Sequence, residues 1–146
     1  LLLRYLKKIF YNSVAELRIY KVEGKNVLEV RIAENPCKPI CALDEQNKAW
    51  AYVRIKDENI LANPVHLNIW KQNRQKESVV IAYTEREQHL LNILKQHGAL
   101  TLNQCSRLSQ INRKQTSELL ADFIRFGLVE QDFKEHTFYF KLTENE

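Results

Sequence analysis

The residues best suited to chemistry lie in a short stretch of the second half of the chain. Asn112 is a good helix N-cap, and the side chains after it could bond base edges: Arg113, Lys114, Gln115 and Ser117. Arginine and lysine can bond guanine, and glutamine can bond adenine. The N-terminus of such a helix would also favour a phosphate. The pattern predicts contact with nucleic acid, in which Lys134 and His136 would touch the nucleic-acid backbone.

Two other interpretations of this helix stay open. Its basic residues are also typical of the solvent-exposed first turn of an ordinary helix. Domains built around a helix of this type also serve in dimerisation or in docking to other proteins. Residues 78–146 hold eight Lys and Arg against nine Asp and Glu. Four acidic side chains would oppose phosphates, whose electrostatic attraction usually supplies most of the affinity: Glu118, Asp122, Asp132 and Glu135.

A second candidate surface lies in the first half, which carries the excess of positive charge. Residues 1–77 hold 14 Lys and Arg against nine Asp and Glu. Basic residues accompany Trp50 and Tyr52 and could form a stacking, nucleic-acid-binding surface with them: Lys38, Lys48, Arg54 and Lys56. The alternative is that the two aromatic residues face the core. That alternative is favoured for Trp50, because Ala49, Ala51 and Val53 occupy the other strand face.

No pattern in the sequence indicates an enzyme or a cofactor. The four histidines are scattered, and Cys37 and Cys41 lack the second ligand pair that a zinc site needs. Packed thiols are the simpler interpretation of the cysteines. The three glycines fall at expected turns or helix ends, so no Gly-rich phosphate loop is predicted.

The elements expected in the second half occur in a diagnostic order. Thr84–Glu87 and Thr101–Gln104 are capping boxes that open two helices. The first is expected to point Leu90, Leu91 and Leu94 inward, and the second to run through Leu108. A turn at 109–111 precedes the helix capped by Asn112, whose core-facing residues are Leu119, Leu120, Phe123 and Ile124. Strands at 128–130 and 137–142 flank a charged tip at 131–136. Helix, short strand, helix, turn, helix and hairpin together predict a winged helix-turn-helix.

The first half alternates between polar and apolar residues, which is typical of strands. Residues 16–22 and 27–32, separated by the turn 23–26, predict a β-hairpin. Further strands are expected at 40–43 and 49–55, followed by a polar loop and a helix that begins at Asn63-Pro64. Apolar residues before the hairpin recur at helical spacing: Leu2, Leu3, Leu6, Ile9 and Phe10. The polar stretch 71–78 is the expected linker, which gives domains at 1–77 and 78–146.

Composition bounds these expectations. The chain has 146 residues, 45% of them hydrophobic, and a net charge of +4. Because no apolar run approaches about 18 residues, no membrane span is expected. Three cysteines, an odd number in a chain large enough to fold without disulfides, favour a reducing, cytoplasmic environment. The sequence contains no Met at all, even at position 1, so we expect the back portion of a longer protein.

Short motifs in both halves also carry a family resemblance. They are Gly24–Val30, Lys38-Pro39, Ala51–Arg54, Asp57–Asn59 with Ala62, and the segment from Tyr83 to Tyr139. With them, the chain resembles the C-terminal part of bacterial proteins that carry a Schlafen-type Alba-like domain followed by a winged helix. The N-terminal portion of that family, with its Phe-Lys segment and Gly-Gly strand, has no counterpart here.

The resemblance implies an α+β fold, with a partial Alba-like sheet domain before the winged helix. Such proteins are described as DNA-binding transcriptional regulators and sometimes as ATP-binding proteins, and some Schlafen relatives cut RNA with acidic residues. We therefore expect a DNA-binding regulator. Edge strands and the Leu-rich first helix favour a homodimer. The alternatives are an RNA-cleaving or nucleotide-hydrolysing enzyme whose active site lies in a missing portion, or a protein-interaction module.

Overall fold

The computed structural model describes residues 15–75 and 83–144. The chain divides into two compact units, Leu1–Ala62 (unit 1) and Asn63–Glu146 (unit 2). The described residues form a mixed α+β structure with four helices and three small antiparallel sheets. The expected helix at 2–10 lies outside the described residues.

Unit 1 begins with the predicted hairpin, which the structure confirms. β1 (Ala15–Val22) pairs with β2 (Lys25–Ile32) in antiparallel register from Ala15–Ile32 to Val22–Lys25. The turn is tighter than the expected 23–26. Only Glu23 and Gly24 lie outside the strands, with positive φ of 49° and 76°. Two left-handed residues make a turn whose twist matches that of the strands, and this allows pairing to continue up to it.

The second sheet of unit 1 has three strands in the order β3-β4-β5. The predicted strands correspond to β3 (Cys41–Leu43) and β4 (Ala49–Ile55). The region expected as a polar loop contains β5 (Glu58–Leu61), which pairs with Tyr52–Ile55. A left-handed Lys56, with φ of 53°, reverses the chain between β4 and β5. Backbone pairing with β4 thus makes a strand of a segment in which two polar residues, Glu58 and Asn59, precede two apolar ones.

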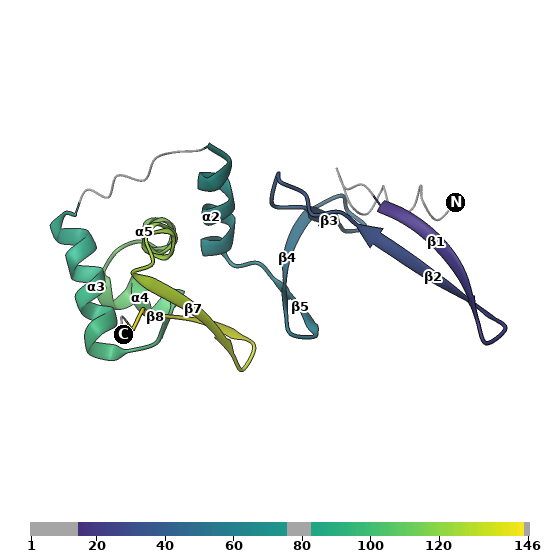
Figure 1. Cartoon of the computed structure of the whole chain (residues 1–146). Coiled ribbons are helices and arrows are strands. Elements are labelled where there is room, and N and C mark those ends of the chain that lie inside the picture. Colours follow the sequence, from purple (N-terminus) through teal and green to yellow (C-terminus); the bar gives the residue numbers. More distant parts are fainter. Residues whose placement is uncertain (1–14, 76–82, 145–146) are drawn as a thin grey trace. The chain divides into compact units, whose positions relative to one another are not determined.

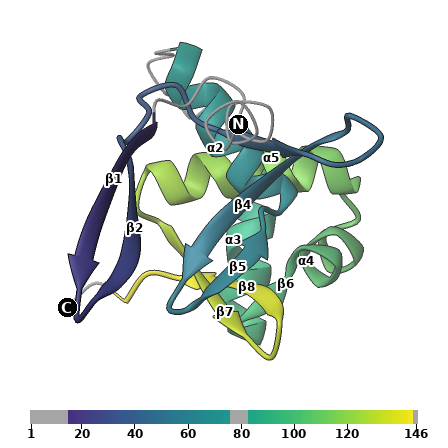
Figure 2. The same cartoon turned by 90° about the vertical axis from the view of Figure 1, so that its right-hand side faces the viewer.

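Unit 2 contains the helices. They are α2 (Pro64–Gln75), α3 (Glu85–His97), α4 (Leu102–Ser109) and α5 (Arg113–Arg125). Its sheet has the order β6-β8-β7, formed by β6 (Leu100–Thr101), β7 (Val129–Lys134) and β8 (Thr137–Leu142). The tip of the β7–β8 hairpin projects beyond the helices (Figures 1 and 2).

The predicted helix ends are confirmed by their hydrogen bonds. The Thr84 amide donates to the Glu87 carboxylate at 3.0 Å, and the Thr101 amide donates to Gln104 Oε1 at 2.8 Å. In return, the backbone amide of Gln104 donates to Thr101 Oγ1 at 3.3 Å, which completes the second capping box. Gly98 ends α3 with a φ of 74°, and its amide bonds the Leu94 carbonyl.

The helices and the sheet of unit 2 share one hydrophobic core. Phe123 and Phe140 are the largest fully buried side chains. Around them lie buried residues of every helix and of all three strands: Val65, Leu90, Ile93, Leu94, Leu100, Leu102, Cys105, Leu120, Ala121 and Val129. Leu91 and Leu119, expected to point inward, are only partly buried and pack at the edge of this cluster.

α2 belongs to unit 2. The chain divides into its two units between Ala62 and Asn63, whereas the sequence predicted the division after residue 77. Val65 is fully buried in the core, and Asn68 Nδ2 donates to Ser117 Oγ of α5 at 3.0 Å. One turn later, Gln72 Nε2 donates to Asp122 Oδ1 at 2.8 Å. α2 therefore runs beside α5 (Figure 1). Residues 71–75 of the expected linker continue this helix, and 76–78 lie outside the described residues.

The start of α2 is joined to the β7–β8 hairpin by a ring of side-chain hydrogen bonds. His66 Nδ1 lies 3.1 Å from Asn63 Oδ1, an acceptor, so this nitrogen carries the proton. His66 Nε2 then accepts from Gln131 Nε2 at 3.1 Å, and Asn63 Nδ2 donates to Gln131 Oε1 at 3.3 Å. The Phe138 ring packs edge-to-face against the imidazole, with 5.1 Å between the ring centroids. Burial lowers the pKa of His66, which favours this neutral form.

Acidification is expected to destabilise unit 2 through His66. Because the pKa is lower in the folded state, the unfolded chain binds the proton first as the pH falls below about 6.5. The free energy of unfolding should therefore fall from pH 7 towards the folded-state pKa. Urea unfolding across this range should show a weaker pH dependence for His66→Gln. His136→Gln, at an exposed turn, should behave as wild type, and an unchanged slope in His66→Gln would exclude this explanation.

Candidate nucleic-acid interface

The connection between α4 and α5 determines how the candidate reading helix is presented. Gln110 is left-handed, with a φ of 58°, and turns the chain directly after α4. Buried or half-buried hydroxyl groups hold this turn. Ser106 Oγ donates to the Ile111 carbonyl at 2.6 Å, and Ser109 Oγ donates to the Cys105 carbonyl at 2.7 Å. With Ile111 itself buried, the turn is firmly attached to the core and fixes where α5 begins.

The first turn of α5 is exposed, as the sequence predicts. Asn112 Oδ1 accepts the Gln115 amide at 2.9 Å and caps the helix. Arg113, Lys114 and Gln115 are all exposed, whereas Thr116 is fully buried and anchors the turn. The first turn contains no acidic residue, so two cationic side chains and the positive end of the helix dipole coincide. This arrangement suits an anionic ligand with hydrogen-bonding groups.

Asn103 at the start of α4 is a further residue of this surface, which the sequence pattern did not single out. Its Oδ1 accepts a hydrogen bond from Arg113 Nε at 3.0 Å. The bond joins the first turns of α4 and α5 and uses the Nε donor, so the terminal nitrogens of the guanidinium remain for another partner. The available signal was the position of Asn103 within the Thr101–Gln104 capping box, two residues after the N-cap, but its contact with Arg113 is non-local.

Ser117 differs from the prediction. Only 3% of its surface is exposed. Its Oγ donates to the Lys114 carbonyl at 2.7 Å and accepts from Asn68 Nδ2 of α2 at 3.0 Å. The side chain faces α2, where it cannot reach a base edge. The exposed candidates in α5 are therefore the three residues that precede Thr116.

The β7–β8 hairpin presents Lys134 and His136 close to its turn. The turn itself is formed by Glu135 and His136, both with positive φ, so it is shorter than the expected tip at 131–136. Lys134 Nζ lies 2.7 Å from Asp132 Oδ2, and this hydrogen bond is the main reason why the pKa of Asp132 is lowered. Lys134 is 70% exposed but already has an anionic partner, so its attraction for phosphate is reduced.

Two of the other acids expected to oppose phosphate are placed differently. Asp122 accepts from Gln72 and lies against α2, while Glu118 is half-buried in the middle of α5. Glu135 is exposed at the hairpin turn. The unfavourable charges are thus distributed along unit 2, and the first turn of α5 remains locally basic.

Most of the basic residues expected at the surface of unit 1 already have partners within that unit. Lys38 pairs with Glu34 at 2.7 Å, and Arg54 donates to Asn59 Oδ1 at 3.1 Å and lies 3.9 Å from Asp57. Lys48 stands over the Trp50 ring, with its Nζ 4.0 Å from the centroid. Lys56 is exposed at the β4–β5 turn. These side chains come from a loop, two turns and a strand, and three of them already have partners.

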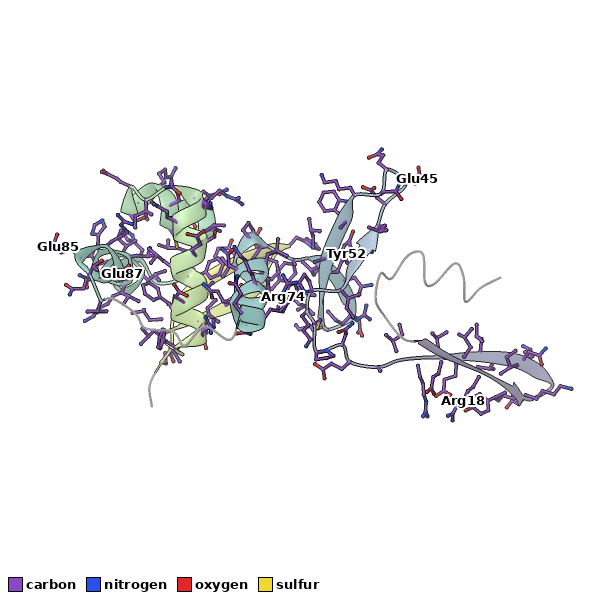
Figure 3. The ribbon with its side chains drawn as sticks, turned by 90° about the horizontal axis from the view of Figure 1, so that it is seen from above. Arg18, Glu45, Tyr52, Arg74, Glu85 and Glu87 are labelled. Atoms are coloured by element: carbon purple, nitrogen blue, oxygen red, sulfur yellow. The ribbon has the colours of Figure 1, made fainter. Side chains whose placement is uncertain are left out.

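Trp50 and Tyr52 are not core residues. Tyr52 on β4, labelled in Figure 3, is 49% exposed, and the buried residue of that strand is Ala51. Trp50 is half-buried, and its Nε1 donates to Asp44 Oδ2 at 2.8 Å. This bond is the first cause of the lowered pKa of Asp44. Tyr52 therefore adds an exposed aromatic ring to unit 1, whereas Trp50 is engaged by its neighbours.

The described residues contain no group of three His, Cys, Asp or Glu side chains that could hold a metal ion. Cys37 is exposed, Cys41 is half-buried and Cys105 is buried in the core. Burial raises the pKa of the Cys105 thiol to about 12, so this thiol is unreactive. None of the helices in the described ranges combines the length and the apolar character of a membrane span.

The strongest site in the described residues is therefore the first turn of α5 with Asn103 beside it. Its features are exposed hydrogen-bonding side chains, local positive charge and a rigid turn behind them. No protein-family model matches the chain, and no curated protein or solved structure matches it either.

Proposed function

We propose that unit 2 is a winged helix-turn-helix that binds double-stranded DNA through the first turn of α5. The observation that carries the proposal is the exposure of Arg113, Lys114 and Gln115 on a helix that follows a short, firmly held turn. In helix-turn-helix proteins, the N-terminal residues of the second helix of the motif contact base edges in the major groove. The order α4, turn, α5 and the presence of side chains suited to guanine and adenine support the proposal.

The contacts between α2 and α5 narrow the surface that could enter a groove. α2 bonds α5 at Ser117 and Asp122, and Arg125 Nη1 donates to Gln72 Oε1 at 3.3 Å. These three positions run from the second turn of α5 to its last residue, on the side that α2 covers. We infer that α5 approaches DNA end-on, with its first turn leading, while the β7–β8 hairpin acts as the wing and brings Lys134 and His136 to the phosphates.

The resemblance to Schlafen-type Alba-like proteins with a winged helix supports the same class of function. On this basis we propose a role in transcriptional regulation, in which unit 1 corresponds to the Alba-like sheet domain. The paired cations of unit 1 support only a minor electrostatic contribution from that unit. A homodimer that reads two half-sites remains a prediction, as does a cytoplasmic location.

Duplex binding should be salt-dependent and should require Arg113 and Lys114. We expect Arg113→Ala/Lys114→Ala to weaken binding at least tenfold, because each lost contact contributes about 1–3 kcal/mol. Fluorescence anisotropy with a mixed-sequence duplex, at about 50 mM and about 200 mM salt, measures both effects. The control Arg86→Ala/Lys95→Ala removes the same charges from exposed positions of α3.

Each outcome of this titration has a clear meaning. A larger loss in the α5 variant than in the α3 variant supports the proposed surface. Equal losses would mean that net charge alone governs binding, and salt-independent or undetectable binding would refute the DNA-binding proposal. In that case, size-exclusion chromatography with light scattering would test the docking or dimerisation alternative, and an RNA-cleavage assay would test the enzyme alternative.

A further inference from the structure

The β1–β2 hairpin has two chemically different faces. Its register places Leu17 opposite Val30 and Ile19 opposite Leu28. Because side chains alternate across a strand, these four residues and Ile32 share one face. Beyond them, Lys21 and Asn26 face each other and end the apolar row at the turn.

The opposite face is mixed, because it carries charged residues together with Tyr20, Val22 and Val27. Arg31 Nε donates to Glu29 Oε1 at 3.0 Å, and the Tyr20 hydroxyl donates to Glu29 Oε2 at 2.9 Å. Arg18, labelled in Figure 3, pairs with Glu16 at 3.7 Å. Exposed ion pairs of this kind need no further partner, so the charged part of this face can stay in water. On the first face, by contrast, charge appears only beyond the apolar row, at Lys21.

The apolar face is uncovered by the residues that the structure describes. Ile19 is 72% exposed, Ile32 is 50% exposed, and Leu28 and Val30 are exposed to similar degrees. A two-stranded hairpin alone is at best marginally stable in water, and a continuous apolar row of this kind is normally covered. The exposed row therefore indicates that another apolar surface packs here.

The size of the face distinguishes between possible occupants. Five side chains on two strands cover about 15 Å by 10 Å, a footprint on the order of 150 Å². A stable dimer buries about 800 Å² on each partner, so face-to-face packing of two copies through this row is too small. A helix of about nine residues is about 14 Å long and about 10 Å wide, which matches the face.

The chain carries such a segment directly before β1. Leu2, Leu3, Leu6, Ile9 and Phe10 recur at helical spacing, and Arg4 and Lys8 fall on the other side of that pattern. Four residues, 11–14, separate this segment from Ala15, where β1 begins. We infer that the segment 2–10, with its apolar residues at helical spacing, is the occupant of the apolar face of the β1–β2 hairpin of the same chain.

Hydrogen exchange on the full chain tests this intramolecular docking. Leu6→Asp/Ile9→Asp places two carboxylates on the apolar stripe, and Arg4→Asp/Lys8→Asp places two on the opposite side. The stripe variant should raise exchange at residues 16–32 at least tenfold, and the control should not. Residues 83–144 serve as an internal reference, since neither variant should alter them. Equal exchange of the hairpin in wild type and both variants would overturn the inference.

A cross-link gives an independent measurement. Leu6→Cys/Leu28→Cys, in a Cys37→Ser/Cys41→Ser background, should form an intrachain disulfide on oxidation. The buried Cys105 thiol can stay in place because it is unreactive. Lys8→Cys/Leu28→Cys is the control and should not cross-link, because a disulfide needs Cα atoms within about 7 Å. An interchain product would assign the face to a second copy, and an uncross-linked chain would exclude docking; both refute the inference independently of DNA binding.

Discussion

Replacing Phe123 with alanine is expected to lower the free energy of unfolding of unit 2 by about 3–5 kcal/mol. Phe123 is fully buried on α5, and its cluster includes Leu90 of α3 and Phe140 of β8. The substitution removes the transfer free energy of the ring and leaves a cavity that three elements cannot close together. Because the lost contacts join helices to the sheet, the effect should appear as loss of unit 2 as a whole.

Phe126→Ala is the matched control. Phe126 directly follows α5 and is 41% exposed, so truncating it leaves no enclosed cavity and should cost about 1 kcal/mol or less. Urea unfolding followed by far-ultraviolet circular dichroism measures both variants. Similar losses in the two variants would contradict the assignment of Phe123 to the centre of the core.

Local sequence signals predicted much of this fold because their physical causes are local. A capping box such as Thr101–Gln104 satisfies backbone donors within four residues, so its outcome does not depend on the rest of the chain. The same applies to the Asn112 cap and to the alternation in β1 and β2. Helical periodicity placed Leu120 and Phe123 in the core, although it missed Ile93 next to the expected Leu94.

Features that depend on distant partners were not predictable in this way. β5 exists because its backbone pairs with β4, and its sequence, two polar residues followed by two apolar ones, gives no alternating pattern. The β7–β8 hairpin extends further than expected for the same reason, since Asp132 and Lys134 pair across it with Tyr139 and Thr137. Backbone pairing of this kind overrides side-chain polarity at positions that face solvent.

The same distinction between local causes and distant partners applies to the candidate site. Exposure of Arg113, Lys114 and Gln115 follows from the Asn112 cap and the apolar stripe of α5, both readable from the sequence. Ser117 is buried because α2 packs against it, where Asn68 bonds its hydroxyl group; Asn68 lies 49 residues earlier in the sequence. No local pattern contains that contact, so a small hydroxyl residue next to three exposed ones was expected to be exposed as well.

Replacing Val65 with aspartate is expected to detach α2 from unit 2 and to lower its free energy of unfolding by about 3 kcal/mol. Val65 is the one α2 residue that is fully buried in the core. A carboxylate there loses its hydration without gaining a partner, yet an acidic residue in the first turn does not disfavour the helix itself. The substitution therefore tests the docking of α2 separately from its formation.

Leu67→Asp makes the same chemical change two residues further along α2, where the side chain is 42% exposed. This control should cost less than about 1 kcal/mol. Hydrogen exchange should show faster exchange at Asn68 and Gln72, and at their α5 partners, in the Val65 variant alone. If both variants behave alike, α2 does not stabilise unit 2, and the boundary between the units would return to residue 77. If only Val65→Asp destabilises, a fragment meant to carry the α4–turn–α5 surface must begin at Asn63, because the core beneath that surface is incomplete without α2.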